Sequence, residues 1–165
     1  MSRRLTLALI AAVALAGAYV PRLRATPASG FSGVTAAFAR FEEFDIKNKS
    51  IPANIWMEQF KTKGETDFYV QQNTWAAGGN TGWHTHPGAS FILVTSGTVT
   101  AYEGDDPTFS PHVYTAGQGF IDPGGEHTHI IRNEGTVTAT SVTVQLIPAG
   151  AMRRIDVPNP GNCPF

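Results

Sequence analysis

GGNTGWHTHPG, residues 78–88, and DPGGEHTHIIRN, residues 122–133, are the two stretches that decide the fold of this chain. Each holds two histidines separated by one residue, His84 with His86 and His127 with His129, and these are four of the five histidines in the sequence. Side chains two residues apart in an extended strand project from the same face. Each pair is therefore arranged to chelate, and a divalent metal ion is the simplest common target.

Strand patterns surround both stretches. Val142, Val144 and Leu146 alternate with polar residues, which is the pattern of a half-buried strand. Aromatic and β-branched residues recur between turns rich in glycine, proline and asparagine, and 76–80 is one of these predicted turns. The predicted strands are 41–47, 54–60, 66–75, 90–95, 97–102, 112–115, 119–122, 127–132 and 136–147. So many short strands predict an all-β protein, either a small barrel or a two-sheet jelly roll.

The first stretch resembles the first conserved motif of the cupin superfamily. Gly78 is followed by five residues and then by His84 and His86, and Gly97 closes the segment. Cupins often carry a glutamate ligand between the second histidine and this last glycine, at the position that Ser90 occupies here. The resemblance therefore implies a metal site without its usual carboxylate.

The second stretch resembles the second cupin motif. Gly117 is followed by five residues and Pro123, then by a glycine, a histidine and Asn133. His129 stands four positions before Asn133, as the histidine of this motif does. Its distance from Pro123 is one residue longer than usual, so either the turn carries an insertion or His127 shares the role.

The resemblance implies a single cupin-type jelly-roll β-barrel over residues 41–150. A divalent cation, Fe, Zn or Mn, would lie inside it, held by His84, His86 and His129. Three protein ligands with an open position are typical of catalytic rather than structural metal sites. Water, a substrate, or a replacement ligand such as His127 or Glu126 would take that position. His127 and Glu126 are also the candidates for proton transfer, and plain surface exposure is the alternative for both.

The N-terminal residues 1–18 have the pattern of a secretory signal peptide. Arg3 and Arg4 precede an uncharged run from Leu5 to Val20, which contains a small-x-small cleavage pattern at 16–18. The run is slightly shorter than the ~17–25 residues that a bilayer span needs. We therefore expect an exported protein, periplasmic or secreted, and an uncleaved membrane anchor is the alternative.

Residues 19–40 are rich in small residues, with several prolines and glycines, and are predicted to be a linker with at most one or two helical turns at 34–40. Residues 151–165 contain three prolines and are predicted to be a C-terminal tail packed on the barrel without regular structure. The single cysteine, Cys163, has no partner for an internal disulfide.

The charge and composition of the chain limit the classes of binding partner that we expect. The formal net charge is −1 and basic patches are absent, so neither a nucleic acid nor an anionic membrane surface is favoured. We expect a small-molecule ligand or substrate, and no stable membrane association after cleavage of the signal. The resemblance to cupins implies a homodimer.

Two functions fit these features. The first is an exported metal-dependent enzyme, a dioxygenase, isomerase or lyase acting on a small organic molecule. The second is a non-catalytic module that binds a small molecule or a metal. Ser90 favours the binding module, whereas the open coordination position favours the enzyme. The fold does not choose between them, because cupins carry out many functions.

Overall fold

The computed structural model describes residues 25–51 and 56–165, and every regular element in this part of the chain is a β-strand. The predicted all-β fold is confirmed. The predicted signal peptide and the beginning of the predicted linker lie outside the described residues. Within the described ranges, no helix has the length and hydropathy of a membrane span. The strands are β1 (Ser29–Phe41), β2 (Asp45–Lys49), β3 (Met57–Lys61), β4 (Thr66–Asn80), β5 (His84–Thr85), β6 (Ser90–Ser96), β7 (Thr98–Glu103), β8 (His112–Thr115), β9 (Gly119–Asp122), β10 (His129–Arg132), β11 (Ala139–Pro148) and β12 (Ile155–Asp156).

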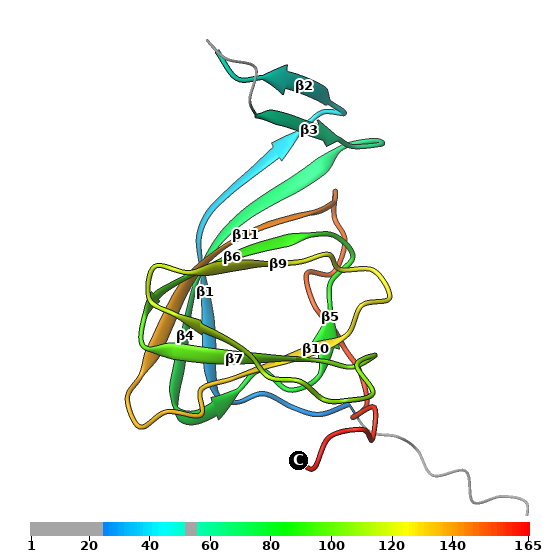
Figure 1. The fold of residues 1–165 in the computed structure, drawn as a ribbon. Helices are drawn as coiled ribbons and strands as arrows, with labels where there is room; N and C mark the ends of the chain where they lie inside the picture. The colour runs from blue at the N-terminus through cyan, green and yellow to red at the C-terminus, as the bar shows by residue number, and fades with distance from the viewer. Residues whose placement is uncertain (1–24, 52–55) are drawn as a thin grey trace, which may run out of the picture.

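Ten of these strands form one antiparallel sheet that curls into a nearly closed barrel (Figure 1). Its main path runs β12-β5-β10-β4-β11-β6-β9, while β1 pairs with β4, and β7 pairs with β10 and β8. β4 continues through 76–80, where a turn was predicted, because its last residues pair with β1 and β10. The curl brings β5 and β10, which carry the two histidine stretches, next to each other.

The linker prediction is wrong for residues 29–40, which form most of β1. This strand pairs with β4 along nearly its whole length, with a register shift between Thr35 and Ala37. Phe31 packs against Trp75 with ring centroids 5.0 Å apart. At the other end, Arg40 makes a bidentate ion pair with the Asp67 carboxylate, at 2.7 and 3.0 Å. Pairing with a distant strand thus orders a segment whose own composition is typical of a linker.

β2 and β3 form a separate two-stranded hairpin that projects away from the barrel (Figure 1). Their register pairs Asp45 with Lys61 and Lys49 with Met57. Ile46 and Phe60 lie directly opposite each other and are partly exposed. This hairpin takes no part in the barrel wall.

The barrel interior has two unlike halves. The apolar half is a buried cluster of Trp75, Val94, Val99, Ala101, Ile131 and Ala139. The polar half lies further along the same strands and contains Gln71, Asn73, Ser90, Thr143 and Gln145, together with the histidines. The cross-strand register keeps the apolar and polar halves separate. In the apolar half Ala139 lies opposite Trp75, and in the polar half Gln145 lies opposite Ser90.

The C-terminal tail was predicted to lack regular structure, but it contains β12, which pairs with β5, and its last residues pack on the outside of the barrel. A second apolar cluster, Trp83, Tyr102 and Ile130, is covered there by Val157 and Cys163. The Asn162 side chain donates to the carbonyl oxygens of Gly104 (3.3 Å) and Asp106 (2.9 Å). Burial raises the pKa of the Cys163 thiol to about 11, so this thiol stays protonated at neutral pH.

Candidate metal centre

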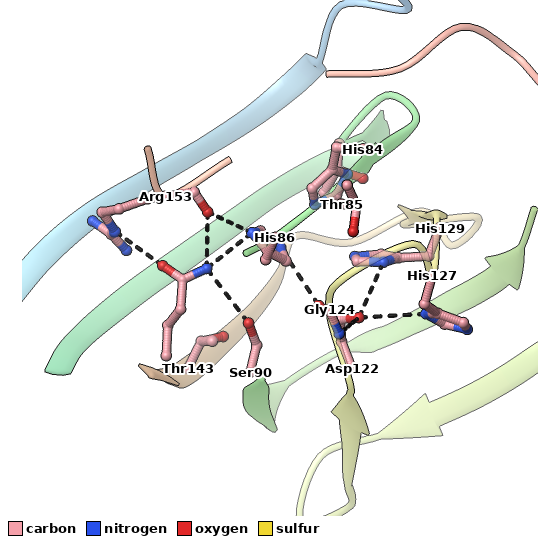
Figure 2. A network of polar contacts seen from close by, with 12 residues as sticks. His84, Thr85, His86, Ser90, Asp122, Gly124, His127, His129, Thr143 and Arg153 are labelled. Carbon is pink, nitrogen blue, oxygen red and sulfur yellow. Dashed lines mark hydrogen bonds and ion pairs between the residues drawn. The ribbon is translucent and has the colours of Figure 1, made fainter. Parts of the chain in front are cut away.

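His84, His86 and His129 converge in the polar half of the barrel (Figure 2). His84 on β5 and His129 on β10 are direct antiparallel partners, so their side chains share one face of the sheet. Their ring centroids are 4.3 Å apart, and the His86 ring lies 4.9 Å from His84 and 5.6 Å from His129. One nitrogen of each ring lies within 4.8 Å of the other two. The three rings, which come from two separate stretches of the sequence, were predicted to converge, and the structure brings them together.

Backbone carbonyl groups orient two of the three rings. His84 Nδ1 lies 2.9 Å from the Gly82 oxygen, and His86 Nδ1 lies 2.6 Å from the Arg153 oxygen. A carbonyl oxygen can only accept, so His84 Nδ1 carries the proton and donates it, which leaves a free lone pair on its Nε2, the arrangement that metal-ligating histidines adopt. His86 Nδ1 has two neighbours: it can donate to the Arg153 oxygen or accept from Gln145 Nε2, which is 2.9 Å away. Its Nε2 has a free lone pair in the tautomer that donates to Arg153.

The turn that supplies the first of these carbonyls requires glycine. Gly82 has a φ of +67°, in the left-handed region, and a Cβ at this position would overlap the Thr26 carbonyl oxygen. The Thr26 hydroxyl also accepts from the Trp83 backbone N–H at 2.7 Å. The chain before β1 and the turn before β5 thus hold His84 in place together.

Burial keeps the three imidazoles neutral. It lowers the pKa of His84 to about 3, lowers that of His86, and lowers that of His129 well below its ordinary value. Neutral imidazole is the form that binds a metal ion. These rings therefore need no deprotonation to bind a cation near neutral pH.

Asp122 is a buried carboxylate that the sequence analysis missed. It ends β9, and its Oδ1 accepts from the Gly124 backbone N–H at 3.0 Å. The same oxygen lies 3.5 Å from His129 Nδ1. Oδ2 lies 3.7 Å from His86 Nε2 and has no hydrogen-bond partner. The strand predicted over 119–122 ends at this residue, but its place opposite Ser90 follows only from the pairing of β9 with β6.

His127 and Glu126 lie outside the three-histidine group. His127 Nε2 is 2.7 Å from Glu103 Oε2, and its Nδ1 is 3.4 Å from Asp122 Oδ1. Asp122, His127 and His129 make a second group of donor atoms within 4.8 Å of one another. Burial raises the pKa of the Glu103 carboxyl. Glu126, in contrast, is exposed on the turn.

A cavity of about 260 Å³ opens beside His84, His86 and His129. Trp75, Ile92 and Ile131 supply its apolar surface. Polar side chains from β4 and β11, and two arginines after β11, supply the rest: Gln71, Asn73, Thr143, Gln145, Arg153 and Arg154. Arg153 and Arg154 were not predicted to line a cavity, because they belong to the segment 151–165, which was predicted to be a tail packed on the barrel.

Hydrogen bonds join these polar side chains to one another. Asn73 Nδ2 donates to Ser141 Oγ (3.2 Å) and Thr143 Oγ1 (2.9 Å). Arg153 Nε donates to Gln145 Oε1 at 3.0 Å, and its Nη1 donates to Thr35 Oγ1 at 2.7 Å. These bonds hold the Arg153 guanidinium on the wall of the cavity, and the Arg154 guanidinium is held by an ion pair with Asp156 and a hydrogen bond to the Thr81 carbonyl oxygen.

The donor set fits a divalent cation. Three neutral imidazoles suit zinc or ferrous iron, and the buried, unpartnered Asp122 Oδ2 is the kind of atom that a cation beside it would satisfy. His112, which was interpreted as a surface residue, is exposed on β8.

The family model for the cupin domain matches residues 73–144. Among solved structures, a polyketide cyclase, RemF from Streptomyces resistomycificus, is 14% identical, covers 83% of this chain and 80% of its own, and has a TM-score of 0.52. A cupin superfamily protein from Desulfitobacterium hafniense is 11% identical, with coverages of 69% and 81% and a TM-score of 0.42. An oxalate oxidase is 24% identical over 50% of this chain and 46% of its own, with a TM-score of 0.41. No curated protein matches the sequence.

Proposed function

Because residues 73–144 match the family model for the cupin domain, we propose that this chain binds a divalent metal ion through His84, His86 and His129 and acts on a small organic molecule. One observation carries the proposal. One nitrogen of each of the three rings lies within 4.8 Å of the other two, and the His84 Nδ1 is held by the Gly82 carbonyl, so its Nε2 lone pair is left free beside His86 and His129. A purely structural pair of histidines needs no such arrangement.

A metal held by neutral imidazoles supplies Lewis-acid chemistry when it is bound. Around it, the residues of this chain bind and orient the substrate. Arg153 lines the cavity with a positive charge, and Arg154, which is paired with Asp156, lies on the same wall, while Asn73, Thr143 and Gln145 offer hydrogen bonds. This lining suits a small organic anion, and guanidinium groups are well shaped to hold a carboxylate.

For proton handling we propose His127 rather than Glu126. His127 contacts Asp122 on one side and Glu103 on the other, and Asp122 in turn lies beside His86 and His129. Glu126 is exposed on the turn. Dioxygenase, isomerase and lyase reactions, with Fe, Zn or Mn as the metal, are all compatible with this arrangement.

Metal content tests the site. In natively purified protein, elemental analysis should find about one equivalent of a divalent metal per chain. His84→Ala and His129→Ala should weaken its binding by at least ~100-fold, because each removes a ligand. His112→Ala is the matched control and should keep the metal. Equal metal content in all of these proteins contradicts the proposal.

The second candidate function is a binding module without turnover, which the serine at position 90 favours. Oxygen uptake and product analysis with a panel of small carboxylates separate the two functions. Substrate-dependent turnover that is lost in His129→Ala supports the enzyme. Tight binding of a carboxylate that stays chemically unchanged supports the module.

We also propose that the chain is exported and that residues 1–18 are removed. N-terminal sequencing of the protein recovered from the periplasm or medium should find a start near residue 19. Recovery of the full-length chain in the membrane fraction supports an uncleaved anchor instead. Sedimentation of the mature protein tests whether it is a homodimer.

A further inference from the structure

The outer surface of one barrel wall is apolar. β1, β4, β11, β6 and β9 lie side by side in this wall. On β11, Thr143 and Gln145 line the cavity, so the residues that alternate with them point away from the interior. These residues are Val142, Val144 and Leu146. The apolar side of this strand therefore faces outward, whereas in most antiparallel sheets the polar side meets water.

A row of five apolar side chains crosses this wall from edge to edge. Residues directly opposite each other in a ladder share a face, and the register joins Ala37, Val70, Val144, Phe91 and Ile121 in that order. All five are half-buried or exposed. We call this row the outer apolar face, together with its neighbours in the adjoining rows, Phe68, Leu146, Val142 and Leu93. None of these residues is charged, and a lack of charge is typical of the centre of a protein interface.

The projecting β2–β3 hairpin presents apolar side chains to the same side of the molecule. Ile46 and Phe60 are opposite partners, so both point to one face of the hairpin. Phe60 lines a cleft of about 450 Å³ together with Phe91 and Leu146 of the outer apolar face. With Ile46 and Phe68 it also lines a second cleft, of about 470 Å³. The apolar side of the hairpin and the outer apolar face therefore border the same space.

The size of the outer apolar face indicates which partner fits it. At ~4.8 Å per strand and ~3.4 Å per residue, its footprint is roughly 300–400 Å². A stable dimer of standard size buries about 800 Å² on each partner. The face alone is too small, but in a two-fold dimer each hairpin would add contact with the other copy. A hairpin of two strands is also only marginally stable by itself in water, so this contact would stabilise it.

We propose that two copies of this chain pack through their outer apolar faces and that the β2–β3 hairpin of each copy lies against the other. A two-fold axis makes the interface the same patch on both copies, so each supplies one face and one hairpin and receives one of each. The two apolar sheets would stack ~10 Å apart. This interface lies on the outside of the barrel and contains none of the three histidines.

The test is the dissociation constant of the dimer, measured on natively purified protein by sedimentation equilibrium. Leu93→Glu and Ile121→Glu each place a charge in the interface, at positions that are 52% and 62% exposed in the single chain. The fold should therefore be retained, which circular dichroism checks. We expect each variant to raise the dissociation constant by at least ~100-fold, because the charge would be buried without a partner. Val113→Glu, at an exposed apolar residue of β8 outside this face, is the matched control and should stay within about three-fold.

Phe60→Glu tests the hairpin. It should raise the dissociation constant by at least ~10-fold, because it charges the side of the hairpin that meets the other copy. Met57→Glu is the matched control, since Met57 is exposed on the opposite side of the same hairpin. Equal effects of Phe60→Glu and Met57→Glu overturn the role of the hairpin.

Three further results overturn the inference. The first is a chain that stays monomeric at ~100 µM, where a dimer of micromolar affinity is almost fully formed. The second is a monomer that binds phosphatidylcholine vesicles and loses this binding in Leu93→Glu, because a membrane would then be the partner of the face. The third is a dimer that Leu93→Glu and Ile121→Glu leave intact, because the copies would then pair through another surface. His84→Ala should dimerise like the wild type, so loss of the proposed metal site leaves this inference standing.

Discussion

The apolar and polar halves of the barrel interior are built from the same strands but differ in their side chains and in their roles. β4 contributes Trp75 to the apolar half and Asn73 to the polar half, and β10 contributes Ile131 to one and His129 to the other. The apolar half is a buried cluster, of which Trp75 and Ile131 also form one side of the cavity, whereas the polar half holds the histidines and a network of hydrogen bonds. The comparison indicates that one half stabilises the barrel and that the other is available for binding.

Removing Trp75 should have the largest effect on stability. Trp75 is 1% exposed, and Trp75→Ala would leave a void in the apolar half. We expect the free energy of unfolding to fall by about 3–5 kcal/mol, measured by urea denaturation. Val137→Ala, at a site that is 65% exposed, is the control and should change it by less than about 0.5 kcal/mol. A similar change in both variants would mean that the apolar half does not dominate stability.

Acid should destabilise the metal-free protein through the polar half. The pKa of His84 is lowered to about 3 by burial, so below about pH 6.5 the unfolded chain binds a proton that the folded chain excludes. The free energy of unfolding should therefore fall as pH drops from 7 towards 4, by up to ~1.4 kcal/mol per pH unit for this histidine. Urea denaturation in chelator measures the slope. His84→Gln should flatten it, whereas Val94→Ala should lower stability equally at every pH.

Asn73→Ala tests the hydrogen-bond network of the polar half. The substitution removes the donor that serves Ser141 and Thr143, both of which are buried. We expect a loss of about 1–3 kcal/mol in the free energy of unfolding, less than for Trp75→Ala. Asn48→Ala, on the exposed projecting hairpin, is the control. A negligible loss at Asn73 would show that this network does not contribute to stability.

Ser90→Ala should have the smallest effect. The only hydrogen bond that its hydroxyl makes within the described residues is a long one, 3.5 Å from Gln145 Nε2. We expect a change of less than about 1 kcal/mol in the free energy of unfolding and less than three-fold in Co²⁺ affinity. A loss of metal binding here would mean that Ser90 itself contributes to the site.

The sequence alone predicted those strands and site residues that depend on a local pattern. Strand alternation predicted β6 to β11, and the histidine pairs predicted which rings converge. β1 and Asp122 were missed because each depends on a partner far along the chain, β4 in one case and Ser90 in the other. Arg153 was missed for the same reason, since its contacts with Thr35 and Gln145 appear only when the tail folds back. The signal peptide at 1–18 stays a prediction.

The Arg153 carbonyl that orients His86 lies beyond the last long strand of the barrel. Ribosomes make a chain from its N-terminus, so this oxygen is added after all three rings. A nascent chain that already contains the three rings still lacks the group that orients one of them. Full affinity for a cation should therefore develop only after the segment that follows β11 has been made and has folded back.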